Sequence, residues 1–240
     1  MNAAVTVFFL IIKVFSLYFL AVSLFGLCRR RTPEPAARLR RFAVLIAARN
    51  EESCIAGLIE SLRAQHYPPE LVDIWVLPNN CTDRTAEAAR RAGAQVLEMP
   101  ASVRSKGAAL HTAAKALLRS TRNYDAFCVF DADNEADPAF LSEMNRALDR
   151  TAIVKSRILA KNRTQAGISA CYEIYFCSAN HFLNRAREAM GLSARVIGTG
   201  FAIRRDLLET LDGFPCRTLT EDAELYAACL CRGARIGYCE

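Results

Sequence analysis

The stretch F-A-V-L-I-A-A at residues 42–48 decides the fold class. It is apolar without alternation, which is typical of a strand buried on both faces of a parallel sheet. Residues 51–65 follow with Ile55, Leu58, Ile59 and Leu62 at helical spacing. This order predicts a buried strand followed by a crossover helix, the repeating unit of an α/β domain.

The same alternation continues along the chain. Further strands are predicted at 72–77, 95–98, 126–130 and 153–158, and further helices at 85–92, 106–118 and 167–190. Strands that alternate with helices indicate a mostly parallel sheet flanked by helices. Ligands in such sheets bind beyond the carboxyl ends of the strands, so the residues that follow each strand are the candidate site.

Polar residues cluster at those strand ends. Asn50 and Glu51 follow the first predicted strand, and Asn79 follows the second. Asp131 and Asp133 leave the fourth strand as two acids one residue apart. Two close carboxylates raise each other's pKa unless a cation lies between them. Mg²⁺ or Mn²⁺ prefers a few carboxylates plus phosphate oxygens, so the pattern predicts a divalent metal beside a phosphate.

The charge distribution argues against nucleic acid as a partner. The chain carries a net charge of +6, but seven basic residues and one acid lie in residues 1–41. The remainder holds 24 basic and 24 acidic residues, so the globular part is neutral. A nucleic-acid binder is expected to carry its basic face on the domain itself.

Ten cysteines raise the question of disulfides or a zinc site. Cys54, Cys128, Cys171 and Cys177 lie in apolar stretches, which predicts small core residues. There is no C-x-x-C pair and there are only three histidines, so the spacing does not match a structural zinc site. Reduced, cytosolic thiols are the better interpretation.

The amino-terminal segment predicts a membrane anchor. Residues 3–28 are apolar apart from Lys13 and a few small polar side chains, and about 20 such residues suffice to cross a bilayer. Lys13 opposes insertion. A cleaved signal peptide is the alternative, but no basic region precedes the apolar run and no A-x-A site follows it. Arg29, Arg30 and Arg31 would hold the downstream chain in the cytoplasm.

Six motifs in order resemble glycosyltransferase family 2, the group with the GT-A fold that includes cellulose, chitin and poly-N-acetylglucosamine synthases. They are I-A-A-R-N-E-E (46–52), N-N-C-T-D-R-T (79–85), R-S-K-G-A-A-L (104–110), D-A-D (131–133), G-T-G-F (198–201) and T-E-D (220–222). The resemblance implies a GT-A type, Rossmann-like sheet. It covers residues 42–240, which would be the catalytic domain. The apolar run and the basic residues before this domain predict a transmembrane anchor over 1–28 and a basic linker over 29–41.

The resemblance implies a role for each matched position on the donor side. The nucleotide pocket would be lined by Ala48, Asn50, Glu51, Asn79, Lys106 and Asp131. Asp133 would ligate Mg²⁺ or Mn²⁺. The expected donor is a UDP-sugar. Asn79 stands where the family usually has an aspartate that contacts uracil, so an amide would take the place of that carboxylate.

On the acceptor side, Asp222 would be the general base and Glu221 would support the acceptor, which would be a saccharide or a lipid-linked sugar. A single displacement with inversion follows, because the diphosphate leaves without protonation. Composition alone favours a different interpretation of residues 220–222, namely a threonine cap with acids in the first helical turn.

Two alternatives remain open. Processive members of the family carry a Q-x-x-R-W motif followed by further membrane helices, and residues 1–240 contain neither. The chain would therefore be a fragment, or a degenerate scaffold protein that binds nucleotide sugars without transfer. A sugar nucleotidyltransferase is a weaker alternative, because residues 49–52 contain no glycine for a phosphate loop.

Overall fold

The computed structural model describes residues 3–27, 35–162, 166–215, 217–218 and 220–240. Within them the chain forms two compact units. The smaller comprises residues 1–32 and 158–194, and the larger comprises 33–157 and 195–240. The predicted arginine cluster 29–31 and the junction between anchor and linker lie outside the described residues.

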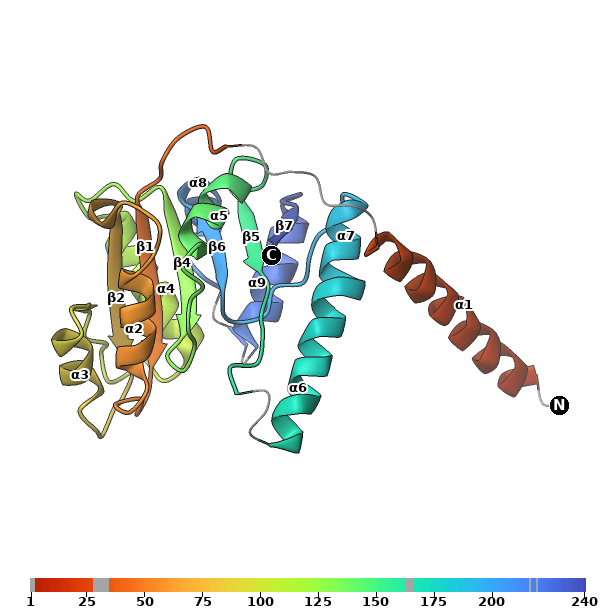
Figure 1. The fold of residues 1–240 in the computed structure, drawn as a ribbon, viewed down its shortest axis with the longest axis horizontal. Coiled ribbons are helices and arrows are strands. Elements are labelled where there is room, and N and C mark those ends of the chain that lie inside the picture. Colours follow the sequence, from red (N-terminus) through yellow and green to blue (C-terminus); the bar gives the residue numbers. More distant parts are fainter. Residues whose placement is uncertain (1–2, 28–34, 163–165, 216, 219) are drawn as a thin grey trace. The chain divides into compact units, whose positions relative to one another are not determined.

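The larger unit is built on a seven-stranded sheet of order β3-β2-β1-β4-β6-β5-β7 in the part of the chain described (Figure 1). Its strands are β1 (Phe42–Ala48), β2 (Val72–Pro78), β3 (Gln95–Val96), β4 (Ala126–Asp131), β5 (Ile153–Ser156), β6 (Phe201–Arg204) and β7 (Ile236–Cys239). Strands β3, β2, β1 and β4 are parallel, whereas β6 is antiparallel to both β4 and β5. The predicted mostly parallel α/β sheet is therefore confirmed, with one reversed strand.

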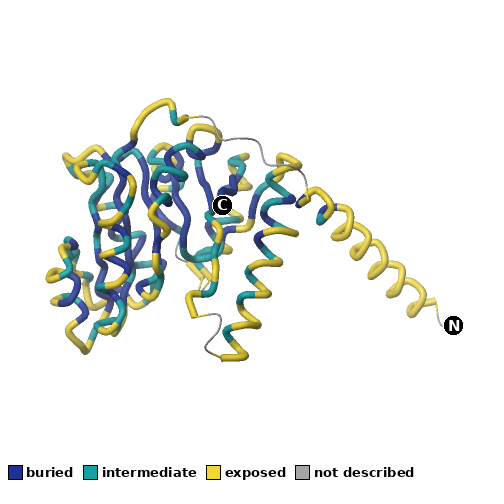
Figure 2. The backbone as a smooth tube through the Cα atoms, viewed as in Figure 1, coloured by how far each residue is buried: buried dark blue, intermediate teal, exposed yellow. Residues whose placement is uncertain are grey.

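Helices cover this sheet and bury its strands (Figure 2). They are α2 (Ile55–Arg63), the short 3₁₀ helix η1 (Pro69–Leu71), α3 (Thr85–Arg91), α4 (Lys106–Leu118), α5 (Phe140–Ala147), α8 (Arg205–Thr210) and α9 (Glu221–Cys231). The apolar faces of α2 and α5 join alternate residues of β1 and β4 in one core. Because every residue of β1 except the partly buried Ala47 is buried, its polar neighbours are confined to its two ends.

The first helix begins later than the sequence pattern predicts. Residues 51–54 form a turn in which the Glu51 carbonyl accepts the N–H groups of Cys54 and Ile55, and α2 starts at Ile55. Asn50 has a φ of 58°, a left-handed conformation that asparagine tolerates better than most residues. The chain therefore reverses sharply at the end of β1, which leaves Asn50 and Glu51 in a loop at the sheet edge.

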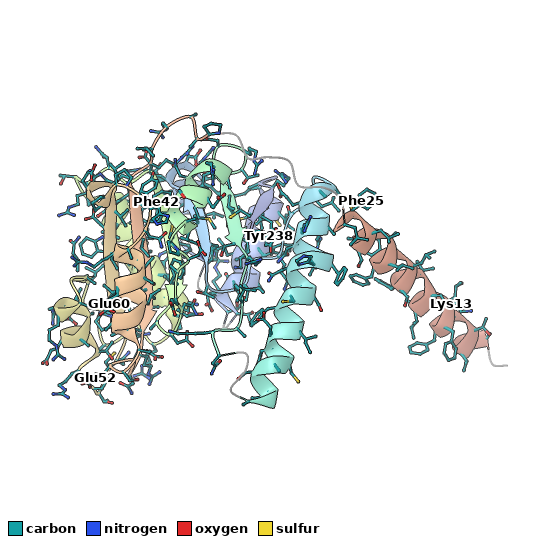
Figure 3. The ribbon with its side chains drawn as sticks, viewed as in Figure 1. Lys13, Phe25, Phe42, Glu52, Glu60 and Tyr238 are labelled. Atoms are coloured by element: carbon teal, nitrogen blue, oxygen red, sulfur yellow. The ribbon has the colours of Figure 1, made fainter. Side chains whose placement is uncertain are left out.

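The smaller unit contains α1 (Ala3–Phe25) and a long helical segment made of α6 (Gly167–Ser178), the π-helical stretch η2 (Ala179–Arg185) and α7 (Ala186–Ala189). The Ser23 hydroxyl donates to the Phe182 carbonyl over 3.4 Å. By length and composition alone, α1 could cross a membrane, since 23 residues span about 34 Å. Lys13 lies on this helix and is exposed (Figure 3).

Two predictions about the smaller unit were wrong. Cys171 and Cys177 were expected in a core, and both are exposed on α6. The aromatic residues of the same helix were also expected to be core, yet Tyr172 and Tyr175 are more than half exposed. Helical spacing of apolar residues therefore does not identify a buried face here, because α6 has no buried residue. Cys128 is fully buried, as predicted, and Cys54 is partly buried.

Candidate functional site

The candidate site lies at the edge of the larger unit where β1, β2 and β4 end. Figure 3 labels Phe42, which begins β1, and Glu52, which lies beyond its end at the opposite edge. Since β1, β2 and β4 are parallel, their following loops all emerge at the edge of Glu52. The loop before β6 returns to this edge because β6 is antiparallel to β4.

The loops after β1 and β2 are bonded to each other. The Asn50 side-chain oxygen accepts the Thr82 N–H over 2.8 Å, and the Glu51 N–H donates to the Thr85 hydroxyl over 2.9 Å. The Ala48 carbonyl accepts the Asn79 N–H over 2.9 Å. These bonds place the predicted positions Ala48, Asn50 and Glu51 along one continuous rim.

Asn79 is almost fully enclosed at this rim, with 5% of its surface exposed. Its side-chain amide donates to the Ser105 carbonyl over 3.2 Å, and its side-chain oxygen accepts from Asn80 over 2.8 Å. Both ends of the amide are thus held by the protein. Asn79 ties the loop after β2 to the start of α4.

Lys106 connects three motifs that are distant in the sequence. It is the first residue of α4, where the Ser105 side chain caps the helix by accepting the Ala108 N–H over 3.1 Å. The Lys106 ammonium lies 2.5 Å from an Asp131 carboxylate oxygen and 3.6 Å from a Glu221 carboxylate oxygen. It also donates to the Gly198 carbonyl over 2.6 Å. A single cation therefore stands between two acids.

The loop Gly198–Gly200 joins these groups to the paired aspartates. The Thr199 hydroxyl accepts the Asp131 N–H over 2.9 Å and donates to the Asn134 side-chain oxygen. The Asn134 amide in turn donates to an Asp133 carboxylate oxygen over 3.1 Å. Asp133 itself is exposed and pairs with no cation in the described part of the chain. The loop holds one aspartate and leaves the other facing solvent.

Asp222 and Glu221 lie in the first turn of α9. One Asp222 oxygen accepts the Gly198 N–H over 3.1 Å, and the other accepts the Ala223 N–H over 2.8 Å. Thr220 occupies the cap position, but its side chain makes no capping bond. The prediction that residues 220–222 form a helix cap therefore explains their position at the start of α9. It does not explain the hydrogen bond between Asp222 and Gly198.

The residues present fit a divalent cation bound together with a diphosphate. Among the described residues no group of three or more His, Cys, Asp or Glu side chains could hold a metal by itself. Asp131 has one oxygen on Lys106 and Asp133 has one on Asn134, so each carboxylate keeps an oxygen available. Mg²⁺ and Mn²⁺ accept one or two carboxylates when substrate phosphates complete the shell. Asp133 is the more accessible ligand of the two.

Cys54 lies beside this site but is not a nucleophile. Burial raises the pKa of its thiol to about 11, and the hydrogen bond to Glu51 and the negative charges of Glu51 and Asp133 add to the effect. A thiol with this pKa is protonated at neutral pH, and the thiolate is the reactive form. The chemistry of the site is therefore left to its carboxylates and to Lys106.

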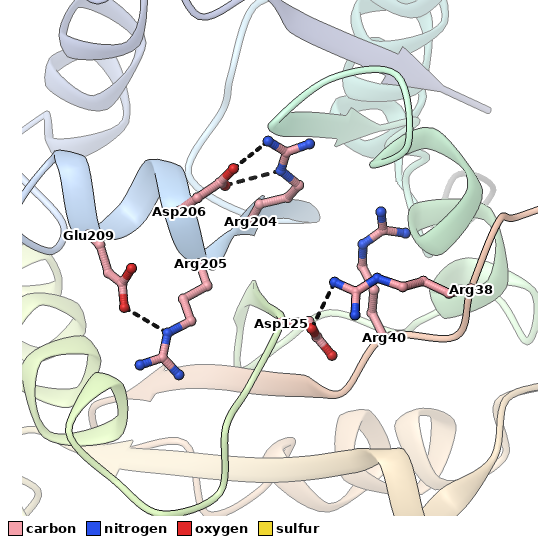
Figure 4. A pocket seen from close by; sticks show the side chains of 7 residues that line it. All are labelled: Arg38, Arg40, Asp125, Arg204, Arg205, Asp206 and Glu209. Carbon is pink, nitrogen blue, oxygen red and sulfur yellow. Dashed lines mark hydrogen bonds and ion pairs between the residues drawn. The ribbon is translucent and has the colours of Figure 1, made fainter.

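A second polar region lies at the opposite edge of the sheet (Figure 4). A hollow of about 440 Å³ is lined by Arg38, Arg40, Asp125, Arg204, Arg205, Asp206 and Glu209. Arg38 pairs with Asp125 over 3.0 Å, Arg205 with Glu209 over 2.6 Å, and Arg204 with Asp206. Arg40 pairs with Asp149 over 2.6 Å. Each of the four guanidinium groups therefore faces a carboxylate.

The structure brings most predicted site residues together and adds two that the sequence analysis missed. Lys106, Asp131, Glu221 and Asp222 meet around Gly198. Thr199 and Asn134 were not predicted, although Asn134 directly follows the D-A-D motif and Thr199 is the centre of G-T-G. Nothing in one sequence indicates that two residues 65 positions apart share a hydrogen bond.

Comparison with known proteins gives the same fold and family. A family profile described as "Glycosyltransferase like family 2" matches residues 40–240. A mannosyltransferase from Pyrobaculum calidifontis, solved with GDP-Man and Mn²⁺, superposes with a TM-score of 0.73 at 21% identity, covering 93% of this chain and 61% of the other. A glucosyl-3-phosphoglycerate synthase from Mycobacterium tuberculosis, solved with Mn²⁺ and UDP, gives 0.55 at 23% identity, covering 83% and 69%. At these identities the likeness concerns the fold.

Curated relatives agree with the profile. The probable glycosyltransferase YdaM of Bacillus subtilis is 26% identical over 204 residues, which is 80% of this chain and 47% of that protein. A beta-monoglucosyldiacylglycerol synthase of Synechocystis is 27% identical over 193 residues, or 76% and 38%. The chain thus spans about half or less of these relatives. With the profile matched from residue 40 to residue 240 on a GT-A type sheet, the chain belongs to the glycosyltransferase-like family 2.

Proposed function

We propose that this chain transfers a sugar from a nucleotide sugar, expected to be a UDP-sugar, to a hydroxyl acceptor with inversion at the sugar carbon. The observation that carries the proposal is the network around Gly198. Lys106 and Asp222 both bond to Gly198, and Asp131 bonds to Lys106. It joins groups suited to a departing diphosphate with a carboxylate suited to an attacking hydroxyl.

On the donor side, Lys106 would hold the diphosphate, since its ammonium is the positive charge already shared between Asp131 and Glu221. Asp133, helped by Asp131, would hold Mg²⁺ or Mn²⁺. That cation would add positive charge at the oxygens of the leaving diphosphate. The rim of Ala48, Asn50, Glu51 and Asn79 would receive the nucleoside.

On the acceptor side, Asp222 would take the proton from the attacking hydroxyl. Both of its oxygens accept backbone N–H groups, which fix the direction of the carboxylate and leave other lone pairs for the substrate. Glu221 would orient the acceptor beside it. One base is enough, because a diphosphate leaves as an anion.

We further propose that the acceptor is lipid-linked and that the enzyme acts at the cytoplasmic face of a membrane, anchored by residues 1–28, with a linker over 29–41 and a catalytic domain over 42–240. Three observations support this. Helix α1 is long and apolar enough to span a bilayer. Helix α6 exposes Ile168, Tyr172, Ile174 and Tyr175. The relative in Synechocystis is named for a diacylglycerol product.

The test is release of nucleoside diphosphate from a panel of nucleotide sugars by the full chain in detergent, with Mn²⁺ or Mg²⁺. Asp133→Asn is expected to abolish metal-dependent release. Asp212→Asn is the matched control, because Asp212 is exposed and has a φ of 59°, which asparagine adopts readily. Release of pyrophosphate would instead indicate a nucleotidyltransferase, and nucleotide binding without release would indicate a scaffold protein.

A further inference from the structure

Lys155 is a buried cation that the proposed reaction does not use. It lies in β5, paired with Phe201 of β6 and Tyr238 of β7, and only 1% of its surface is exposed. It forms no salt bridge with any residue that the structure describes. Burial lowers the pKa of its ammonium to about 7, and the one opposing influence is the weaker electrostatic effect of Cys239 on β7. An unpaired buried cation disfavours folding, so its presence calls for another explanation.

Its two hydrogen bonds go to main-chain carbonyls. The Lys155 amine donates to the carbonyl of Ser156 over 2.7 Å and to the carbonyl of Gly200 over 3.1 Å. The Gly200 carbonyl also accepts the N–H of Ser156 over 2.9 Å and its hydroxyl over 2.7 Å. Three donors therefore converge on one carbonyl oxygen.

Gly200 is equally constrained on its other sides. Its N–H donates to the Val129 carbonyl of β4 over 2.8 Å, and its φ is +60°. A β-carbon at this position would lie 2.8 Å from the Ser156 hydroxyl and 3.4 Å from the Lys155 amine. Only glycine fits both the backbone conformation and the space, so Gly200 is a fixed point between β4 and β5.

This fixed point is the end of the loop that organises the candidate site. Thr199, which directly precedes Gly200, bonds to Asp131 and Asn134. Gly198, which precedes Thr199, bonds to Lys106 and Asp222. A shift of Gly200 would therefore move the groups proposed for the diphosphate and the proposed base together.

We propose that Lys155 is a positioning residue. By its hydrogen bond to the Gly200 carbonyl it would fix the loop 198–200, and that loop would keep Lys106, Asp131 and Asp222 in their relative positions. The inference rests on the proposed function for its catalytic consequence, but its structural part does not. Lys155 touches no substrate and acts only through the loop.

The test compares Lys155→Met with Lys115→Met in the full chain. Methionine matches the lysine side chain as far as the ε-carbon and removes the amine with its donors. Lys115 is a surface lysine paired with Asp212. The measurements are kcat and donor KM for diphosphate release, the unfolding midpoint, and hydrogen exchange of the peptide 196–201. Lys155→Met is expected to lower kcat about tenfold with donor KM nearly unchanged, as loss of one net hydrogen bond would allow.

In the same variant, exchange of the Gly198 and Gly200 amides should rise about tenfold while the unfolding midpoint stays level or rises, because an unpaired buried cation has been removed. Lys115→Met should leave all three measurements unchanged. A lower midpoint, or faster exchange throughout β5, β6 and β7, would make Lys155 a general structural residue and overturn the proposal. Unchanged exchange at 198–200 would overturn it as well.

The exchange measurement separates this inference from the proposed function. If the wild-type chain releases no diphosphate from any donor, the proposed function fails, and exchange of the loop still decides whether Lys155 clamps Gly200. If the wild type is active and Lys155→Met loosens the loop without lowering kcat, the positioning role fails and the proposed function stands.

Discussion

Charged side chains gather at both edges of the sheet that the strand ends form, the candidate site and the edge opposite it. The side chains pair differently at the two edges. Of the four ion pairs named for the hollow opposite the candidate site, two join residues two or four positions apart, Arg204 with Asp206 and Arg205 with Glu209. At the candidate site, Lys106 reaches Asp131 and Gly198, which are 25 and 92 positions away. The other two pairs of the hollow, Arg38 with Asp125 and Arg40 with Asp149, also join distant residues. What distinguishes the candidate site is that Lys106 and Asp222 both bond to Gly198, whereas each pair of the hollow uses a different carboxylate. We therefore expect the ligand at the candidate site.

The largest expected effect concerns the proposed base. Asp222→Asn should lower kcat by about 10²–10⁴-fold, the range that general-base catalysis contributes, with little change in donor KM. Steady-state release of nucleoside diphosphate measures both values. Glu209→Gln is the control from the opposite edge and should retain wild-type kcat. Equal losses in the two variants would remove the distinction between the edges.

The second effect concerns stability beneath the candidate site. The pKa of Lys155 is about 7 in the folded chain, below its ordinary 10.5, so the unfolded chain binds more protons between these pH values. The free energy of unfolding should therefore rise with pH through this window, at no more than about 1.4 kcal/mol per pH unit. Chemical denaturation from pH 7 to 10 measures it. Lys155→Met should remove this rise, and parallel profiles for wild type and variant would argue against the assignment.

The third effect separates a glycine in the site from one outside it. A β-carbon at Gly198 would lie 3.0 Å from the Lys106 amine and 3.5 Å from a Glu221 oxygen. Gly198→Ala should displace the flexible end of Lys106 and lower kcat about tenfold, as for one lost hydrogen bond, with little loss of stability. Gly57→Ala is the control, since Gly57 is helical with nothing within 4 Å of a β-carbon, and it should stabilise by about 0.5–1 kcal/mol. Wild-type kcat in Gly198→Ala would mean that Lys106 does not act from its observed position.

The smallest effect is expected at the opposite edge. Arg205 and Glu209 form an i,i+4 pair in which Glu209 is exposed and Arg205 is partly buried, and such pairs contribute about 0.3–0.5 kcal/mol. Urea denaturation of Glu209→Gln, which leaves the bond from Arg205 to the Leu118 carbonyl in place, should show a change close to that range, and kcat should not change. A large loss of activity would mean that the hollow in Figure 4 takes part in function.

The sequence predicted the sheet and the gathering of polar residues at the strand ends, because a run such as residues 42–48 is buried at all but one position and leaves polar groups only at its ends. It did not predict the reversed strand β6, since Phe201–Arg204 is apolar enough for either direction. It could not predict that Thr199 bridges Asp131 and Asn134, or that Lys155 lies under Gly200. Those contacts depend on register between distant strands, which periodicity does not encode.

The exposed surface of α6 was the clearest failure of pattern reasoning. Aromatic residues at helical spacing predicted a core, and Tyr172 and Tyr175 are exposed instead. Amphipathic spacing reports that a helix has an apolar face, but not what covers that face. The same composition fits a buried helix and one that lies against lipid.

Isothermal titration of nucleoside diphosphate with Mn²⁺ tests most directly which edge is the binding site. The matched variants are Lys106→Met at the candidate site and Arg204→Met at the opposite edge, each losing one cation that now faces a carboxylate. Lys106→Met is expected to weaken binding at least about tenfold, as for the loss of a charged hydrogen bond, and Arg204→Met is expected to leave Kd unchanged. Weaker binding in Arg204→Met together with unaltered binding in Lys106→Met would contradict this expectation.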